Sequence, residues 1–169
     1  MQLISAQTLT SATASVTFSS IPQTFTDLKL MVSDRDNRVG LNDAIGLYFN
    51  GSSSNFTSRR LYGSGASAAS DTEPLYPIID NATTSTANTF ANIEFYIPNY
   101  TSSNYKSFSG DGVMENNATT AYSTLSASLW SNTAAITSIT IALQNATSFN
   151  VGSSFYLYGI SSDTANQNT

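Results

Sequence analysis

The stretch NIEFYIP, residues 92–98, alternates apolar residues with a glutamate and a tyrosine and then stops at a proline. Its three apolar residues fall on one side of an extended chain and the other two on the opposite side. This period of two is typical of a β-strand with one face in a hydrophobic core. Pro98 cannot donate a backbone hydrogen bond, so we expect the strand to end there.

The same alternation recurs along the chain and predicts about eight to ten strands. Clear segments lie at 14–18, 28–32, 45–49, 125–129, 139–143 and 155–160, and weaker ones at 3–9, 75–80 and 106–114. Helix signals are scarce, because only residues 53–63 resemble a short helix, and an irregular strand is an equal alternative. We therefore predict an all-β fold, an antiparallel two-sheet sandwich of the jelly-roll type.

The alternation also predicts which side chains form the core. They are Leu28, Leu30, Val32, Ile45, Leu47, Phe49, Ile93, Phe95, Ile139, Ile141, Leu143, Phe155 and Leu157. In the segment 125–129 the apolar face consists of Leu125, Ala127 and Leu129, with serines between them.

The 169 residues suit a single domain, 1–169, in which residues 1–9 are a possible interface strand or arm and 162–169 a flexible tail. Charged residues make up only 10% of the chain, against roughly 25% in an average soluble domain. A net charge of -5 argues against nucleic-acid binding, which needs clustered basic residues. No stretch approaches the ~20 apolar residues of a membrane span, and the start at Met1 lacks the usual secretion signal.

Catalytic signals are weak, because the chain contains neither histidine nor cysteine. Two carboxylates, Glu94 and Glu115, are the candidates for glycosidase chemistry, but ordinary exposed strand glutamates explain them better. Asp34, Asp36 and Asp43 offer oxygens for a structural ion, although carboxylates that cap their own turns are the simpler interpretation. We predict no enzyme activity, no cofactor and no metal site.

Aromatic side chains are candidates for glycan or partner contacts, because a ring can stack on the apolar face of a sugar. The candidates are Tyr62, Tyr100, Tyr105 and Trp130. The favoured alternative places such rings on outer strand faces or in a subunit interface. The basic pair Arg59 and Arg60 is better explained by a solvated loop or an intersubunit ion pair than by an anionic ligand.

The closing segment FYLYGI, residues 155–160, carries bulky side chains on both faces. The face opposite the core would be an apolar patch, which soluble monomers rarely leave bare. We expect it to be covered by the N-terminal segment crossing it and by a neighbouring subunit, with Gly159 marking a close backbone approach. The predicted interface consists of Leu3, Ile4, Tyr156, Tyr158 and Ile160.

Several segments together resemble small jelly-roll virion structural proteins of tailed bacteriophages. They are SSIPQTFTDLKLMVSDRDN, LYFNGSSSNFTSRRLYGSG, IPNYTSSNYKSFSGDG, AAITSITIALQ and GSSFYLYGIS. The resemblance implies a capsid decoration (cement) protein on the outer capsid surface, assembled in the host cytoplasm, with the major capsid protein as partner. It also implies a homo-oligomer, most commonly a trimer, and no catalytic residues. The alternatives are a head or tail fibre and a carbohydrate-binding jelly-roll domain.

Overall fold

A computed structural model describes residues 1–117 and 120–161, which form twelve strands. The strands are β1 (Gln2–Thr8), β2 (Ser15–Phe18), β3 (Asp27–Asp34), β4 (Asn42–Phe49), β5 (Phe56–Gly63), β6 (Ala68–Asp71), β7 (Ile78–Asn81), β8 (Ala91–Ile97), β9 (Lys106–Met114), β10 (Tyr122–Trp130), β11 (Ile139–Leu143) and β12 (Ser154–Ile160). The predicted tail, 162–169, lies outside the described residues. No helix occurs in the described part, so none there could cross a membrane.

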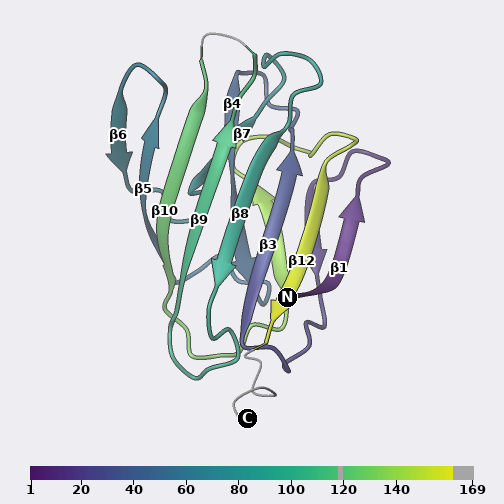
Figure 1. Cartoon of the computed structure of the whole chain (residues 1–169), viewed down its shortest axis with the longest axis vertical. Coiled ribbons are helices and arrows are strands. Elements are labelled where there is room, and N and C mark those ends of the chain that lie inside the picture. The colour runs from purple at the N-terminus through teal and green to yellow at the C-terminus, as the bar shows by residue number, and fades with distance from the viewer. Residues whose placement is uncertain (118–119, 162–169) are drawn as a thin grey trace, which may run out of the picture.

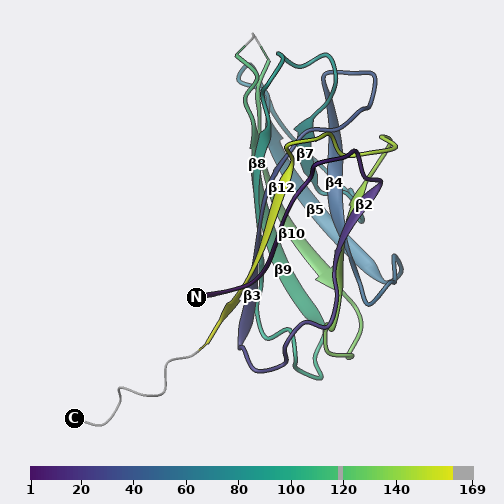
Figure 2. The same ribbon diagram turned by 90° about the vertical axis from the view of Figure 1, so that its right-hand side faces the viewer.

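The strands form two antiparallel sheets that face each other (Figures 1 and 2). The large sheet has the order β1-β12-β3-β8-β9-β10-β5-β6, and the small sheet has the order β2-β11-β4-β7. The predicted all-β sandwich is therefore confirmed, with twelve strands rather than eight to ten. The segment that resembled a helix is strand β5.

Eight of the strands have the arrangement of a jelly roll, in which two groups of four antiparallel strands face each other. β1, β3, β8 and β12 lie in the large sheet, and β2, β4, β7 and β11 lie in the small one. Two hairpins are inserted into this pattern, β5–β6 between β4 and β7, and β9–β10 between β8 and β11. Because β10 pairs with β5, the two insertions join and extend the large sheet beyond β8.

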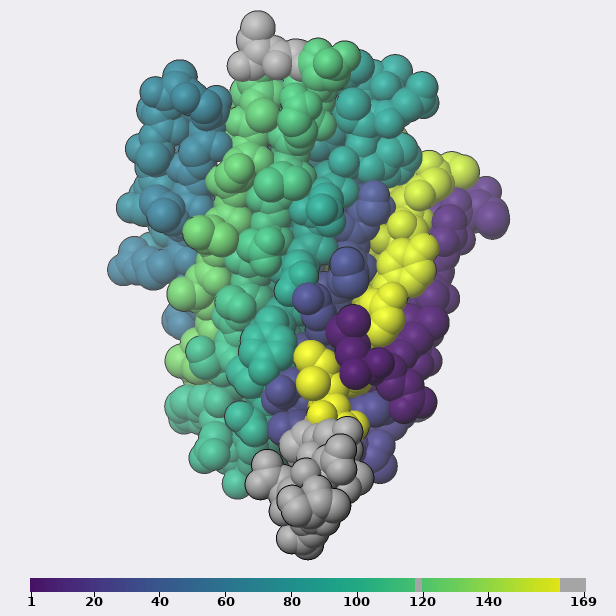
Figure 3. Space-filling view, viewed as in Figure 1, coloured from purple at the N-terminus to yellow at the C-terminus, as the bar shows by residue number. Residues whose placement is uncertain are grey.

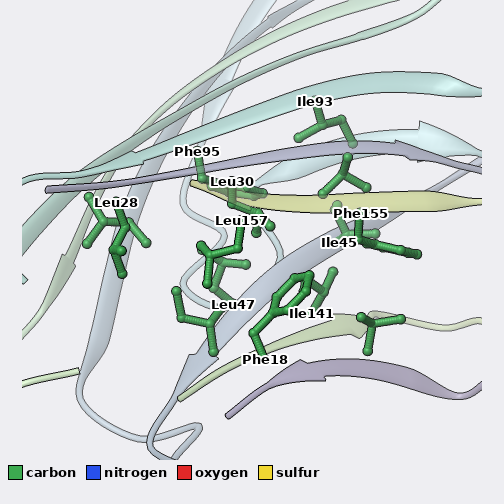
Figure 4. Packing of buried hydrophobic residues seen from close by; sticks show 14 of the residues in the cluster. Phe18, Leu28, Leu30, Ile45, Leu47, Ile93, Phe95, Ile141, Phe155 and Leu157 are labelled. Atoms are coloured by element: carbon green, nitrogen blue, oxygen red, sulfur yellow. The ribbon is translucent and has the colours of Figure 1, made fainter. Parts of the chain in front are cut away.

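The predicted core is confirmed, since every one of its residues is buried and belongs to one hydrophobic cluster. Figure 4 shows Leu28, Leu30 and Phe95 of the large sheet above Leu47 and Ile141 of the small sheet. Burial of each such side chain stabilises the fold by about 1.5–3 kcal/mol.

Strand β10 is oriented opposite to its apolar pattern. Leu125 is 58% exposed, whereas Ser126 and Ser128 are buried. The reason lies across the sandwich, where β7 approaches closely. A Cβ on Gly112 of β9 would lie 2.5 Å from Cγ2 of Ile78, so next to Ile78 this inner face has room only for small side chains, whereas Phe108 and Trp130 are buried farther along the same strands.

Candidate functional site

Two of the four predicted aromatic contacts lie in the core. Tyr100 is fully buried and its hydroxyl donates to the carbonyl oxygen of Pro22. Trp130 is 1% exposed, and its ring packs against Phe49 and Phe56 at centroid distances of 5.4 and 6.1 Å. Neither ring is available to a glycan. This corrects the prediction, because composition alone does not distinguish a core ring from a surface ring.

The other two aromatics lie at opposite ends of the sheet. Tyr62 is half-buried near the end of β5, where it is paired with Thr124 and lies beneath the Arg60 guanidinium, 5.2 Å from the ring centroid. Tyr105 is 59% exposed and directly precedes β9, whose first residue pairs with Trp130. Six residue steps along β10, from Thr124 to Trp130, span about 20 Å and separate the two ends. The four predicted residues therefore do not form one sugar-binding platform.

The outer face of β12 is partly covered by its neighbours in the sheet. Tyr156 and Tyr158 are half-buried between Met31 and Lys29 of β3 on one side and β1 on the other. β1 pairs along the edge of β12, and only the N-terminus itself reaches in front of that strand (Figures 1 and 3). We expected the N-terminal segment to cross this face. That prediction is wrong for most of the segment, which lies beside β12 in the sheet.

The predicted interface residues divide between two faces. Leu3 of β1 is 50% exposed and lies opposite Tyr158, so it shares the outer face with both tyrosines. Ile160 of β12 is half-buried. Ile4 lies at an irregularity in the β1–β12 pairing and packs against the core instead. Gly159 makes room for the Phe25 ring, because a Cβ there would lie 2.3 Å from Cγ of Phe25. The close approach at Gly159 is thus by a side chain and not by a backbone.

The clearest candidate surface lies on the inserted strands, and the sequence pattern, which placed Leu125, Ala127 and Leu129 on a core face, was wrong about it. It consists of Leu61, Val113, Leu125, Ala127 and Leu129, which we call the apolar outer surface. Leu61 and Leu125 are cross-strand partners and are 52% and 58% exposed. No other described segment covers this face (Figure 3). The signal in the sequence was the run of serines and glycines that alternates with these residues.

Three hollows of about 440, 320 and 210 Å³ meet at Ala127 on this surface. The largest is lined by Thr57, Arg59, Ser107 and Leu129, among others, and therefore combines hydroxyl groups and a guanidinium with apolar walls. The two residues of the basic pair have different partners. Arg59 donates to the Thr72 hydroxyl, whereas Arg60 donates two hydrogen bonds, of 3.0 and 2.7 Å, to the carboxylate of Asp71.

Fixed charges border the apolar outer surface on its β8 side. Glu94 forms an ion pair of 2.8 Å with Lys29, and Asp111 lies opposite both Glu94 and Leu125. Burial and the nearby Glu94 raise the pKa of the Asp111 carboxyl, while Lys29 opposes this rise. Glu115 lies four residues beyond Asp111, about 13 Å along the strand direction, and accepts from the amide of Asn117. The two glutamates considered for glycosidase chemistry are therefore not brought together.

The three aspartates considered for a structural ion, Asp34, Asp36 and Asp43, are all buried, together with Asp80, which the sequence did not indicate. Among residues 1–117 and 120–161, no group of three or more acidic side chains has the geometry needed to hold a metal ion. Turn capping accounts for part of the group, because Asp36 accepts from the backbone amide of Arg38.

Comparisons with protein-family models, with curated proteins and with solved structures found no match for this chain.

Proposed function

We propose that this protein is a capsid decoration (cement) protein of a bacteriophage, which binds the outer surface of the head and stabilises it without catalysis. The observation that carries the proposal is the apolar outer surface, where β10 directs Leu125 outward and serines inward. Solvent-facing leucines that gain no core contacts are typical of a protein–protein contact surface. The resemblance to small jelly-roll virion proteins supplies the virion context.

Three further properties support a structural partner. The proposed surface lies on a continuous sheet, which presents a rigid face at little entropic cost. Charges of both signs, Arg59 and Asp111, border it, as is usual for the rim of an interface. The net charge of -5 is unsuited to contact with packaged DNA and favours the outside of the particle.

The direct test is cosedimentation of the purified protein with heads of the same phage that lack it. Replacement of both Leu61 and Leu125 by serine should weaken binding at least tenfold, because two central apolar contacts are lost. Val151→Ser is the matched control, since Val151 is 57% exposed but lies in the loop before β12. Unchanged binding of the double variant would contradict the proposed docking face.

Localisation in a particle reconstruction separates the decoration role from the fibre role. Density on the capsid lattice supports a decoration protein, and density at the tail tip supports a head or tail fibre. The hydroxyl-lined hollow beside Arg59 favours the second alternative, a carbohydrate-binding domain. Glycan-array binding that is lost in Arg59→Ala would support that alternative.

The associated oligomer is proposed to be a homotrimer formed through the outer face of β12 and the start of β1. Leu3 is half-exposed beside Tyr158, so an apolar strip continues to the edge of the large sheet. Light scattering should give about 54 kDa for three 18.0 kDa chains. The variant with Tyr156→Ser and Tyr158→Ser should shift toward a single chain. A monomeric wild type would contradict the trimer.

A further inference from the structure

Four carboxyl groups meet where the two sheets join. Asp34 ends β3 in the large sheet, Asp36 follows two residues later, and Asp43 and Asp80 are cross-strand partners in β4 and β7 of the small sheet. None of the four is more than 2% exposed. A group of acids in this position lies between the two layers and contacts both.

The protein supplies hydrogen-bond donors to only part of this group. Asp43 accepts from the backbone amides of Asn145 and Ala146, at 2.9 and 2.8 Å, and from the Asn145 side chain at 2.7 Å. By contrast, both carboxyl oxygens of Asp34, both of Asp80 and Oδ2 of Asp36 are buried without a donor. A buried charged oxygen without a donor is strongly unfavourable, so these groups require protons or a cation.

Positive charge near the group is limited. The Arg38 guanidinium lies 3.8 Å from Asp43, and no other basic residue acts on these carboxyls. Arg35 is directed away, because its guanidinium donates to the carbonyl oxygens of Thr83, Ser85, Thr86 and Thr89. The ionisable groups that face the four acids are therefore one another, Arg38 and the phenol of Tyr76, which interacts with Asp43.

The four acids form two pairs in which one carboxyl group could donate a proton to the other. Asp34 and Asp80 are within hydrogen-bonding reach of each other, and so are Asp36 and Asp43. Burial raises the pKa of Asp34 and of Asp36 to about 7, and it raises the pKa of Asp80 well above its usual range. Neighbouring carboxylates reinforce the rise in all three groups.

We propose that Asp34 and Asp80 share one proton and that Asp36 holds a second, which it donates to Asp43, so that two carboxyl–carboxylate pairs hold the two sheets together in a pH-dependent way. When the sheets separate, each pair releases one proton to water and leaves two hydrated carboxylates. This inference does not depend on the proposed function.

The direction of the pH dependence follows from the raised affinity for protons in the folded state. Below the ordinary aspartate pKa of 3.8, folded and unfolded chains both hold the protons. As the pH rises toward about 7, only the folded chain still holds them, so stability is lost progressively over that range. The unfolding equilibrium constant should rise about tenfold per pH unit for each proton held.

The test is urea unfolding of the full chain at intervals between pH 5 and pH 8. Asp80→Asn replaces one acid by a neutral amide that can donate to Asp34, so the variant holds one proton fewer. The rise of its unfolding equilibrium constant per pH unit should therefore be about ten times smaller than in the wild type. Glu115→Gln, which changes an acid outside this group, should retain the wild-type slope. A flat wild-type profile between pH 5 and pH 7 would overturn the proposal.

Two further measurements separate protons from a bound cation. Infrared spectra of the wild type should show a protonated carboxyl band at pH 6.5 that disappears on unfolding, and this needs no variant to fold. Calcium chloride or magnesium chloride should leave the thermal midpoint at pH 7.5 within about 1 °C of its value in EDTA. A larger rise that is absent in Asp80→Asn would show that a divalent cation, not protons, neutralises the group and would overturn the proposal.

Discussion

The jelly-roll half of the large sheet and strand β10 of its inserted half use the same alternation of apolar and polar residues, but their leucines face opposite ways. In β3 and β8 the apolar residues point into the core, so that Leu30 and Phe95 are fully buried. In β10 the leucines point outward, and Ser126 and Ser128 take the inner positions. Alternation therefore identifies a strand and its two faces, but what lies opposite decides which face is buried.

The opposing layer differs between the two halves. Beneath β3 and β12 the large side chains of β4 and β11 fill a layer of the usual ~10 Å separation between packed sheets. Beneath β9 the side chain of Ile78 lies within van der Waals reach of both Gly110 and Gly112. Next to Ile78 the inner face of the insertion is therefore restricted to small residues, although Phe108 and Trp130 are buried farther along the same face, and Leu125 is left on the outside.

The largest effect is expected from Phe95→Ala in the jelly-roll half. Phe95 is fully buried and its ring also fills the space above Gly110, 2.9 Å from where a Cβ would be. Removal of the ring should lower the free energy of unfolding by about 3–5 kcal/mol, through lost burial and the cavity that remains. Urea denaturation measures this loss. Ser109→Ala, on the exposed face of the adjacent strand, should change stability little.

The strands and the core of the jelly-roll half could be predicted from the sequence because the same alternation of residues determines both. Each run contains β-branched or bulky residues at every second position, and the facing runs do the same, so the sandwich and its core follow from the pattern. The order of the strands could not be predicted from this alternation. The last strand, β12, lies between β1 and β3, which are early in the chain. That placement depends on tertiary packing and is not encoded in any one segment.

The inserted half and the acid group could not be predicted in the same way. The alternation in β10 distinguishes its two faces but does not fix which one is buried, and the deciding contact comes from Ile78, which is remote in sequence. Asp43 and Asp80 become neighbours only because the β5–β6 hairpin leaves the small sheet between them. The buried positions of Tyr100 and Trp130 likewise depend on loops and strand ends that local pattern does not place.

A smaller effect is expected from Ser126→Leu in the inserted half. The Ser126 hydroxyl is buried, donates to the carbonyl of Gly110 at 3.3 Å, and lies 2.9 Å from where a Cβ of that glycine would be. A leucine at this position has no space, so overpacking should reduce stability by about 1–3 kcal/mol. Thermal and urea unfolding would both detect this. A stabilised variant would show that the inner face next to Ile78 accepts large residues, and the contrast between the halves would then fail.

The smallest effect on stability is expected from Leu125→Ser, at the position next to Ser126. Leu125 is 58% exposed, and its main neighbour is the equally exposed Leu61 on β5. The loss of this surface contact should change the free energy of unfolding by about 0.5 kcal/mol or less. The measurement is a urea titration of Leu125→Ser, Ser126→Leu and the wild type side by side. A loss for Leu125→Ser as large as that for Phe95→Ala would mean that the leucines of β10 face the core. In that case the serines would be the exposed set, and the apolar outer surface would not exist as a binding face.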